Sequence, residues 1–476
     1  MLHLPILRYG KPYRSVDTAT AVHYRTRKPY VEASQANVGL IRRDLMSQHE
    51  AAAILQGFTT KELIAMAAKA SDYFLNHDLP LGETTQSPQE FVEAISATTG
   101  LPWVMVRRNM EKIAGVLASM ETVLMGLTRL PSLDMLDSGV GDIDGRALSF
   151  FPRGDSMGVI LPSNSPGVHS LWAPAIALKT PLILKPGSSE PWAPYRIIQA
   201  YVKAGVPAEV FGYYPTSHAG GGEILRGTGR GMLFGDVAAA KAWSGDPRIE
   251  IHGPGYSKII LADDGAASWE KYLDLMVDSV SNNSGRSCVN CSSIWTTGDS
   301  RKLAEALAER LAQIKPTAED DPKAAIAPLA NPDVAKRISA MVDSELDGGA
   351  EDLCAKVRGT ARVAEYEGCT YLMPSVIHVS SKEHPMANRE FGYPHVSVVH
   401  VEPHDLPECL GPTLVCTALT NDKQLHQRLL ANPHIGRLNL GPISTMKISW
   451  DQPHEGNLFD HLYSRRAFQA VPELVG

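Results

Sequence analysis

The sequence has few cysteines, no strong excess of one charge and no long apolar run. Six cysteines in 476 residues are too few for a disulfide framework. No stretch approaches the roughly 18 apolar residues of a membrane helix, so we expect no membrane span. The net charge of −7, without a basic stripe, argues against nucleic-acid binding. Residues 1–5 lack the features of a secretory signal, so we expect a cytoplasmic protein.

The composition that remains is typical of globular enzymes. Apolar residues make up 44% of the chain and charged residues 20%. The length exceeds what one simple core accommodates, so two or more domains are expected.

Residues 157–261 alternate between strand and helix patterns. Apolar runs predict strands at 157–162, 181–186, 210–214 and 231–235, and the segments 169–179 and 194–204 predict helices. This rhythm indicates a Rossmann-like parallel sheet with helices on both faces, an α/β fold that binds ligands at the carboxyl ends of its strands. Asn164, Lys185 and Gly235 lie at or just past such ends.

The flanking regions differ in pattern. Residues 47–129 favour helices, with Ser87 as an N-cap before Pro88 and Glu90. The Gly- and Asp-rich stretch 137–153 is typical of a hairpin. A second α/β unit follows from about Gly253, with strands at 259–261, 292–297 and 396–401 and helices at 268–281 and 300–314.

One cysteine lies in an unusually polar segment, which reads Asn-Asn-Ser-Gly-Arg-Ser-Cys-Val-Asn-Cys over 282–291. A space-filling thiol usually lies among aliphatic residues, whereas Cys288 has hydroxyls, amides and Arg286 around it. Cys291 completes a C-x-x-C pair, but no second pair of that spacing exists for a zinc site, and we expect no metal. A single nucleophile, Cys288, is favoured. Asn164 offers an amide donor for an oxyanion.

The order of these motifs resembles the aldehyde dehydrogenase superfamily, from about Ala147 to Val401. The resemblance rests on Asn-x-Gly-x-x-Cys at Cys288, Pro-x-Asn-x-Pro at 162–166 and Lys-Pro at Lys185. It implies that Cys288 attacks a carbonyl carbon while Asn164 and the Cys288 backbone N–H hold the oxyanion. Hydride transfer to NAD or NADP would then leave a thioester on Cys288.

The resemblance also implies a cofactor site. Its residues would be Pro162 and Ser163, Lys185 and Ser188 near the adenosine ribose, Phe234, Gly235 and Asp236 at the pyrophosphate, and Glu390 and Phe391 at the nicotinamide ribose. Three positions depart from the family pattern. Asp236 replaces a serine, and Glu390 lies one residue from its usual place. Ser188 replaces an acidic residue that would repel a 2′-phosphate, so NADP is permitted.

The water-activating glutamate of hydrolytic relatives is also displaced. In Glu-Ile-His-Gly-Pro-Gly at 250–255, Ile251 takes its position, and Glu250 and His252 remain as candidate bases. Without such a base a thiol such as CoA takes the acyl group, so we predict a CoA-acylating aldehyde dehydrogenase that interconverts an aldehyde and an acyl-CoA. The alternatives are hydrolytic oxidation to a carboxylic acid and a catalytically silent, cofactor-binding relative.

These inferences predict a domain plan. The NAD(P)-binding domain would comprise 1–134 and 155–252, and the catalytic domain 253–437. The resemblance implies that segments 135–154 and 438–476 mediate assembly into a homodimer or homotetramer. The polar run 451–461 fits either the substrate entrance or a subunit boundary.

Overall fold

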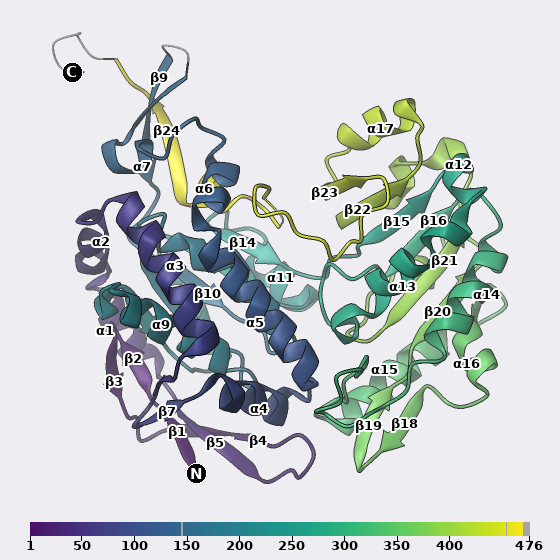
Figure 1. Cartoon of the computed structure of the whole chain (residues 1–476), viewed down its shortest axis with the longest axis horizontal. Coiled ribbons are helices and arrows are strands. Elements are labelled where there is room, and N and C mark those ends of the chain that lie inside the picture. The colour runs from purple at the N-terminus through teal and green to yellow at the C-terminus, as the bar shows by residue number, and fades with distance from the viewer. Residues whose placement is uncertain (144–145, 454, 470–476) are drawn as a thin grey trace.

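The structure is a computed structural model that describes residues 1–143, 146–453 and 455–469. It has two lobes, each built around a seven-stranded sheet, and the chain crosses between them after β14 (Figure 1). The predicted α/β class is confirmed, and the helices and sheets of both lobes follow the alternation seen in the sequence.

The sheet of the first lobe is parallel over five strands and antiparallel at one edge. In sheet order its strands are β14 (Ile249–His252), β13 (Arg230–Phe234), β10 (Met157–Ile160), β11 (Leu182–Lys185), β12 (Phe211–Tyr213), β2 (Ile6–Arg8) and β3 (Lys11–Tyr13). The register pairs Ile160 with Lys185 and with Leu233, so the carboxyl ends of these strands form one edge. This arrangement gathers the loops that follow β10, β11 and β13.

Helices cover both faces of this sheet. They are α1 (Val38–Leu45), α2 (Gln48–Gln56), α3 (Thr60–Asn76), α4 (Pro88–Thr99), α5 (Trp103–Ala118), α6 (Met120–Thr128), α9 (Trp192–Ala204), α10 (His218–Gly227) and α11 (Val237–Trp243). The predicted start of α4 is confirmed: Glu90 N–H donates to Ser87 Oγ at 3.2 Å, and Ser87 N–H donates to Glu90 Oε2 at 2.7 Å.

The helix predicted over 169–179 is wrong as a continuous element. The segment consists of the 3₁₀ turn η1 (Pro166–Val168), the short α8 (His169–Trp172) and a second 3₁₀ turn, η2 (Ala173–Ala175). Pro174 lacks the N–H that an α-helix needs there, which explains why α8 ends at Trp172.

The sheet of the second lobe follows the same plan. In sheet order its strands are β17 (Ala350–Asp352), β20 (Ser375–Val379), β21 (His395–His400), β16 (Ser293–Thr296), β15 (Lys258–Leu261), β22 (Thr413–Leu419) and β23 (Ile435–Leu440), all parallel except β17. Its helices are α12 (Asp263–Ala266), α13 (Leu273–Ser281), α14 (Ser300–Leu311), α15 (Pro332–Glu345), α16 (Leu353–Arg358) and α17 (Lys423–Leu430).

Four smaller sheets complete the described chain. The predicted hairpin forms β8 (Val140–Ile143) and β9 (Arg146–Pro152), and β24 (Tyr463–Ala467) adds to it after α18 (Leu458–Leu462) and α7 (Met135–Ser138) precedes it. The other strands are β1 (Leu2–Leu4), β4 (Thr18–Val22), β5 (Pro29–Ser34), β6 (Leu79–Leu81), β7 (Thr84–Gln86), β18 (Val363–Tyr366) and β19 (Cys369–Leu372). The role of 135–154 and 438–476 in assembly stays a prediction.

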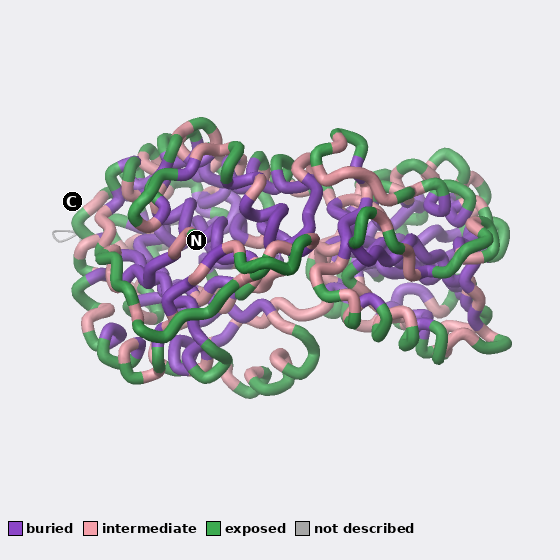
Figure 2. The backbone as a smooth tube through the Cα atoms, turned by 90° about the horizontal axis from the view of Figure 1, so that it is seen from below, coloured by how far each residue is buried: buried purple, intermediate pink, exposed green. Residues whose placement is uncertain are grey.

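Each lobe has its own buried core, seen as separate purple regions in Figure 2. The larger core lies under α3, α5 and α9, and the second lies under α13 and α14. Over the described residues, no helix is long and apolar enough to cross a membrane.

Candidate active site

A cavity of about 700 Å³ opens where the strand ends of the first lobe meet the polar segment around Cys288. Its walls come from five parts of the chain: α5, the loops after β10, β13 and β14, the loop that holds Cys288, the loop before β21, and the C-terminal segment. The lining residues used below are Met105, Arg108, Asn109, Lys112, Pro162, Asn164, Phe234, Gly235, Asp236, His252, Arg286, Cys288, Glu390, Phe391, Lys447 and Glu455.

The loop before Cys288 has a strained backbone. Asn283, Ser284 and Gly285 all have positive φ, at 52°, 59° and 64°, in a 3₁₀ turn, η5 (Asn282–Gly285). Residues other than glycine adopt this region at a cost, and such strain gathers at functional sites. A Cβ on Gly285 would lie 2.4 Å from the Tyr393 carbonyl carbon, so only glycine fits there. The Asn-x-Gly spacing therefore shapes the turn that presents Cys288.

Two further contacts fix the cysteine itself. Its carbonyl oxygen accepts a hydrogen bond from Ser257 Oγ at 2.9 Å, and a Cβ on Gly255 would lie 2.0 Å from that oxygen. Within the described chain, the Cys288 backbone N–H donates to no other group. Gly255 thus permits the close approach of the loop, and the Cys288 N–H is left available to an oxyanion.

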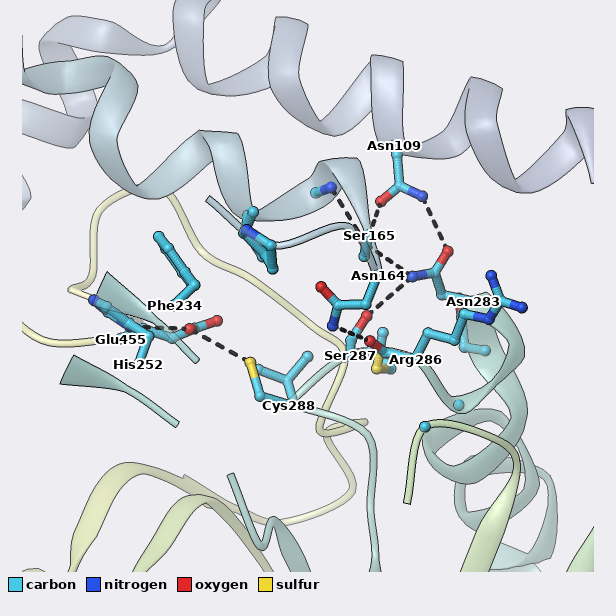
Figure 3. Close-up of a pocket in the computed structure, with 18 of the residues that line it drawn as sticks. Asn109, Asn164, Ser165, Phe234, His252, Asn283, Arg286, Ser287, Cys288 and Glu455 are labelled. Atoms are coloured by element: carbon cyan, nitrogen blue, oxygen red, sulfur yellow. Dashed lines mark hydrogen bonds and ion pairs between the residues drawn. The ribbon is translucent and has the colours of Figure 1, made fainter. Parts of the chain in front are cut away.

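The wall on one side of Cys288 is a network of neutral amides and hydroxyls (Figure 3). Asn164 Nδ2 donates to the Arg286 carbonyl at 2.9 Å, and Asn109 Nδ2 donates to Asn283 Oδ1 at 3.0 Å. Asn283 in turn donates to Ser165 Oγ at 3.0 Å. An amide nitrogen carries two N–H bonds, so Asn164 keeps one for a ligand in the cavity.

The wall on the other side is a chain of carboxylates and imidazoles. Cys288 Sγ lies 3.6 Å from Glu455 Oε2, and that oxygen lies 3.6 Å from His252 Nδ1. His252 Nε2 lies 3.3 Å from Glu250 Oε1, and Glu250 Oε2 lies 3.7 Å from His461 Nδ1. Figure 3 shows Glu455 between Cys288 and His252. The thiol therefore stands at the inner end of a buried acid–base chain.

The charges in this wall set the protonation of the thiol. Burial raises the pKa of Cys288 well above its ordinary value; Glu455 and Glu390 raise it further, and Lys112 opposes them. Burial alone would lower the pKa of His252, but Glu250 and Glu455 outweigh it and raise that pKa to about 9. At neutral pH the site holds a thiol beside a carboxylate that is paired with an imidazolium. A base must therefore take the thiol proton before Cys288 can attack a carbonyl.

The alternation of side chains along β14 determines which of its residues face the cavity. His252 lines the cavity and stacks on Phe234 with ring centroids 4.7 Å apart, whereas Ile251 points the other way, into a cluster with Leu225 and Leu233. This alternation is that of a strand. Glu250 lies behind His252 and outside the main cavity.

The C-terminal segment reaches this wall because of one glycine. Gly456 has φ +82°, and a Cβ there would lie 2.1 Å from Glu250 Oε1. The absent side chain allows Glu455 to lie against His252.

Six of the nine residues expected at the cofactor line the cavity: Pro162, Phe234, Gly235, Asp236, Glu390 and Phe391. They lie mainly at the carboxyl ends of β10 and β13 and in the loop before β21, where an α/β sheet binds dinucleotides. The position of these six residues next to Cys288 fits a nicotinamide cofactor. Among the described residues, no cluster of His, Cys, Asp and Glu has the arrangement of a metal site.

The two acidic residues of this group already have partners. Glu390 Oε2 accepts the Tyr256 backbone N–H at 2.5 Å, and burial raises the pKa of Glu390 to about 7. Asp236 caps α11 by accepting the Ala239 N–H at 2.9 Å. The carboxylate of Asp236 thus occupies the helix end that the resemblance gives to pyrophosphate, which opposes a phosphate-binding role for it.

The other three expected cofactor residues lie beside the cavity, with Lys185 at the end of β11 and Ser163 and Ser188 on the loops after β10 and β11. Ser163 Oγ accepts the Ser189 N–H at 3.1 Å, and a Cβ on Gly187 would lie 2.3 Å from the Pro162 carbonyl oxygen. Lys185 Nζ donates to the Pro186 carbonyl at 3.2 Å, and Ser188 is exposed. The loops after β10 and β11 therefore form one surface, which continues from the cavity edge at Pro162.

Sequence reasoning missed Glu455, Lys112 and Asn109. The polar run 451–461 was the only signal for Glu455, and it indicated an entrance or a subunit boundary without choosing. The helical pattern of α5 concealed Lys112 and Asn109, because nothing in the sequence shows which helix face meets the cavity.

Comparison with known proteins is consistent with this geometry. The model of the "Aldehyde dehydrogenase family" matches residues 84–410, well over half of the chain. The chain belongs to the aldehyde dehydrogenase family. It is therefore related to oxidoreductases that act on aldehydes.

One curated relative, from Dictyostelium discoideum, is described as a probable acylating methylmalonate-semialdehyde/malonate-semialdehyde dehydrogenase of mitochondria. It is 24% identical over 286 residues, which cover 58% of this chain. The match spans about half, 50%, of that relative's own length.

Solved structures share the fold over nearly the whole chain. The aldehyde dehydrogenase KauB from Pseudomonas aeruginosa has a TM-score of 0.81 at 16% identity, covering 98% of this chain and 96% of that one. An indole-3-acetaldehyde dehydrogenase in complex with NAD+ has a TM-score of 0.78 at 15% identity, covering 98% and 96%. At this identity the likeness shows the fold alone.

Proposed function

We propose that the protein is a CoA-acylating, NAD(P)-dependent aldehyde dehydrogenase that works through a thioester on Cys288. The observation that carries the proposal is the convergence of Cys288, the Asn164 amide and the Glu455 carboxylate on one cavity. The acylating character of the curated relative supports the choice of CoA.

The chemistry would begin with the thiol proton. Glu455, 3.6 Å from Cys288 Sγ, accepts it, and the His252 imidazolium stabilises the carboxylate until that transfer. The thiolate attacks the aldehyde carbon, and the resulting oxyanion accepts hydrogen bonds from Asn164 and the Cys288 N–H. A bound NAD(P)+ would supply the hydride acceptor for this carbon, which would leave a thioester on Cys288.

The thioester would then pass to CoA. The CoA thiol attacks the carbonyl carbon, Cys288 leaves as thiolate, and one proton is released to solvent. The balanced reaction is aldehyde, CoA and NAD(P)+ to acyl-CoA, NAD(P)H and a proton. The position of Ile251 supports CoA over water, because an aliphatic side chain in an apolar cluster replaces the glutamate that activates water in hydrolytic relatives.

We propose that Pro162, Ser163, Lys185, Ser188, Phe234, Gly235, Glu390 and Phe391 hold the cofactor. NADP is included because Ser188 puts no carboxylate near the expected 2′-phosphate. We retain the predicted division into an NAD(P)-binding domain (1–134 and 155–252) and a catalytic domain (253–437). Homodimeric or homotetrameric assembly through 135–154 and 438–476 also remains part of the proposal.

A second candidate is hydrolytic oxidation to a carboxylic acid. The same carboxylate favours it: once Glu455 is ionised beside the thioester, it can activate water. Glu250 is a weaker base candidate, because His252 separates it from the thiol.

The deciding experiment is NAD(P)H absorbance with a panel of aldehydes, each with and without CoA. Turnover that requires CoA, and reverses with acyl-CoA and reduced cofactor, would support the acylating enzyme. Sustained turnover without CoA would support hydrolysis. Cofactor binding without any turnover would favour the silent relative.

A further inference from the structure

The substrate side of the cavity is lined by one face of α5. Met105, Arg108, Asn109 and Lys112 all line it, at the three- and four-residue spacing of a single helix face. The cofactor residues lie at the strand ends instead. A molecule that reaches Cys288 without displacing the cofactor would therefore contact α5.

Lys112 is the cation closest to the chemistry on this face. It is half-buried, and it makes no ion pair or hydrogen bond with any residue of the described chain. A Cβ on Gly167 would lie 3.5 Å from Lys112 Nζ, so the ammonium lies near the loop that carries Asn164. Its charge also acts on Cys288 and Glu455, and burial lowers the pKa of Lys112.

The nearby acids do not neutralise this cation by direct contact. Glu455 contacts Cys288 and His252, Glu390 accepts the Tyr256 N–H, and Asp236 caps α11. Arg286, the other cation deep in the cavity, is held by the carbonyls of Thr99 and Pro328.

Two exposed cations extend the positive character toward the mouth. Arg108 lies one helical turn before Lys112, and Lys447 lines the cavity from the C-terminal segment. Neither has an ion pair within the described residues. Charges held partly out of water favour a partner of opposite sign, and a charged lysine donates strong hydrogen bonds to carboxylates.

We propose that the aldehyde substrate carries its own anionic group, a carboxylate in the simplest case, and that Lys112 binds it while Cys288 attacks the carbonyl. The inference rests on the proposed function and narrows its substrate class to ω-oxocarboxylates and similar anionic aldehydes. Arg108 and Lys447 attract the anion toward the cavity, and Lys112 makes the contact.

The test compares ω-oxocarboxylates of several chain lengths with their methyl esters. We expect the wild type to have a higher kcat/KM for the acid at the best length. Lys112→Met should lower the acid-to-ester ratio of kcat/KM by about 30-fold, the size expected for a lost charge-assisted hydrogen bond. Lys447→Met, the matched control at the mouth, should lower it less than about 3-fold.

Reversing the charge at residue 112 distinguishes binding of an anion from a purely structural role of Lys112. Lys112→Glu should lose the acid and gain relative activity on an aldehyde that carries a trimethylammonium group. An unchanged acid-to-ester ratio in both Lys112 variants would overturn the proposal. So would a raised KM for CoA with that ratio unchanged, because Lys112 would then bind CoA phosphates.

A second readout needs no dehydrogenase activity. Iodoacetate is an anion and iodoacetamide is neutral, and both alkylate a cysteine. We expect Lys112→Met to lower the iodoacetate-to-iodoacetamide rate ratio at Cys288, measured by peptide mass spectrometry, by at least about 5-fold. An unchanged ratio would refute the anion site. If the ratio falls but no aldehyde turns over, the anion site stands and the proposed function fails.

Discussion

The two walls around Cys288 differ in chemistry and in origin. The amide wall, with Asn164, Asn109 and Asn283, is neutral; hydrogen bonds hold its side chains in place, and one N–H of Asn164 is left for a ligand. The opposite wall, with Glu455, His252 and Glu250, is a buried chain of charges. The first can stabilise an oxyanion without moving a proton, and the second can move a proton. The difference indicates that oxyanion binding and proton transfer at Cys288 depend on different residues. Mutations can therefore affect one of these two functions without the other.

Both walls act on the Cys288 thiol, so its removal should have the largest effect. Cys288→Ala should lower turnover at least about 1000-fold, because no covalent intermediate can form. NADH production measures it, and cofactor binding should persist. Cys291→Ala is the matched control, since Cys291 is buried and its Sγ contacts the Ser293 carbonyl at 3.2 Å. Equal losses in the two variants would contradict the assignment.

The amide wall should show its effect in kcat. Asn164→Ala should lower kcat about 100- to 1000-fold, the range for a lost oxyanion donor. Asn109→Ala, one layer behind, should cost about 10-fold, because it only positions its neighbours. Both are measured by steady-state kinetics at saturating aldehyde. A loss for Asn109→Ala as large as that for Asn164→Ala would argue against the oxyanion role.

The charged wall should show its effect in the pH profile. Glu455→Gln should lower kcat/KM about 100-fold at neutral pH, because burial still keeps the pKa of Cys288 raised and no carboxylate remains to take the thiol proton. The loss should shrink as pH rises and solvent hydroxide replaces the base. A pH-independent loss would indicate that Glu455 has only a structural role.

The sequence predicted part of each wall: Asn164 in the amide wall and the candidate bases Glu250 and His252 in the charged wall, but neither Asn109 nor Glu455. Asn164, Cys288 and the strand ends that carry them follow from local patterns, as does the capping box at Ser87 and Glu90. Glu455 reaches Cys288 only through the path of the C-terminal segment past Gly456, which no local pattern encodes. The broken helix at Pro174 shows the same limit, because alanine- and leucine-rich composition concealed a series of short turns.

The charged wall should also affect stability. The folded pKa of His252, about 9, lies above the ordinary 6.5, so its contribution is fully present below pH 6.5 and is lost as pH rises through about 9. His252→Gln should therefore destabilise the protein by about 3 kcal/mol more at pH 6 than at pH 10. Urea unfolding at both pH values measures this difference. An equal loss at both would mean that His252 is neutral in the fold.

The smallest expected effect lies outside both walls. Ser188→Glu should reduce NADP use relative to NAD by about 10-fold, because a carboxylate would repel the 2′-phosphate. The ratio of kcat/KM for the two cofactors measures it, with Ser188→Gln as the uncharged control. No change in the ratio would place the adenosine ribose elsewhere.

The most direct test of the account is the intact mass of the protein after mixing with aldehyde and NAD(P)+ in the absence of CoA. The account predicts an added acyl group on Cys288 that accumulates, is absent in Cys288→Ala, and disappears with formation of acyl-CoA when CoA is added. Rapid reduction of the cofactor with no acyl group on Cys288 at any time would contradict it.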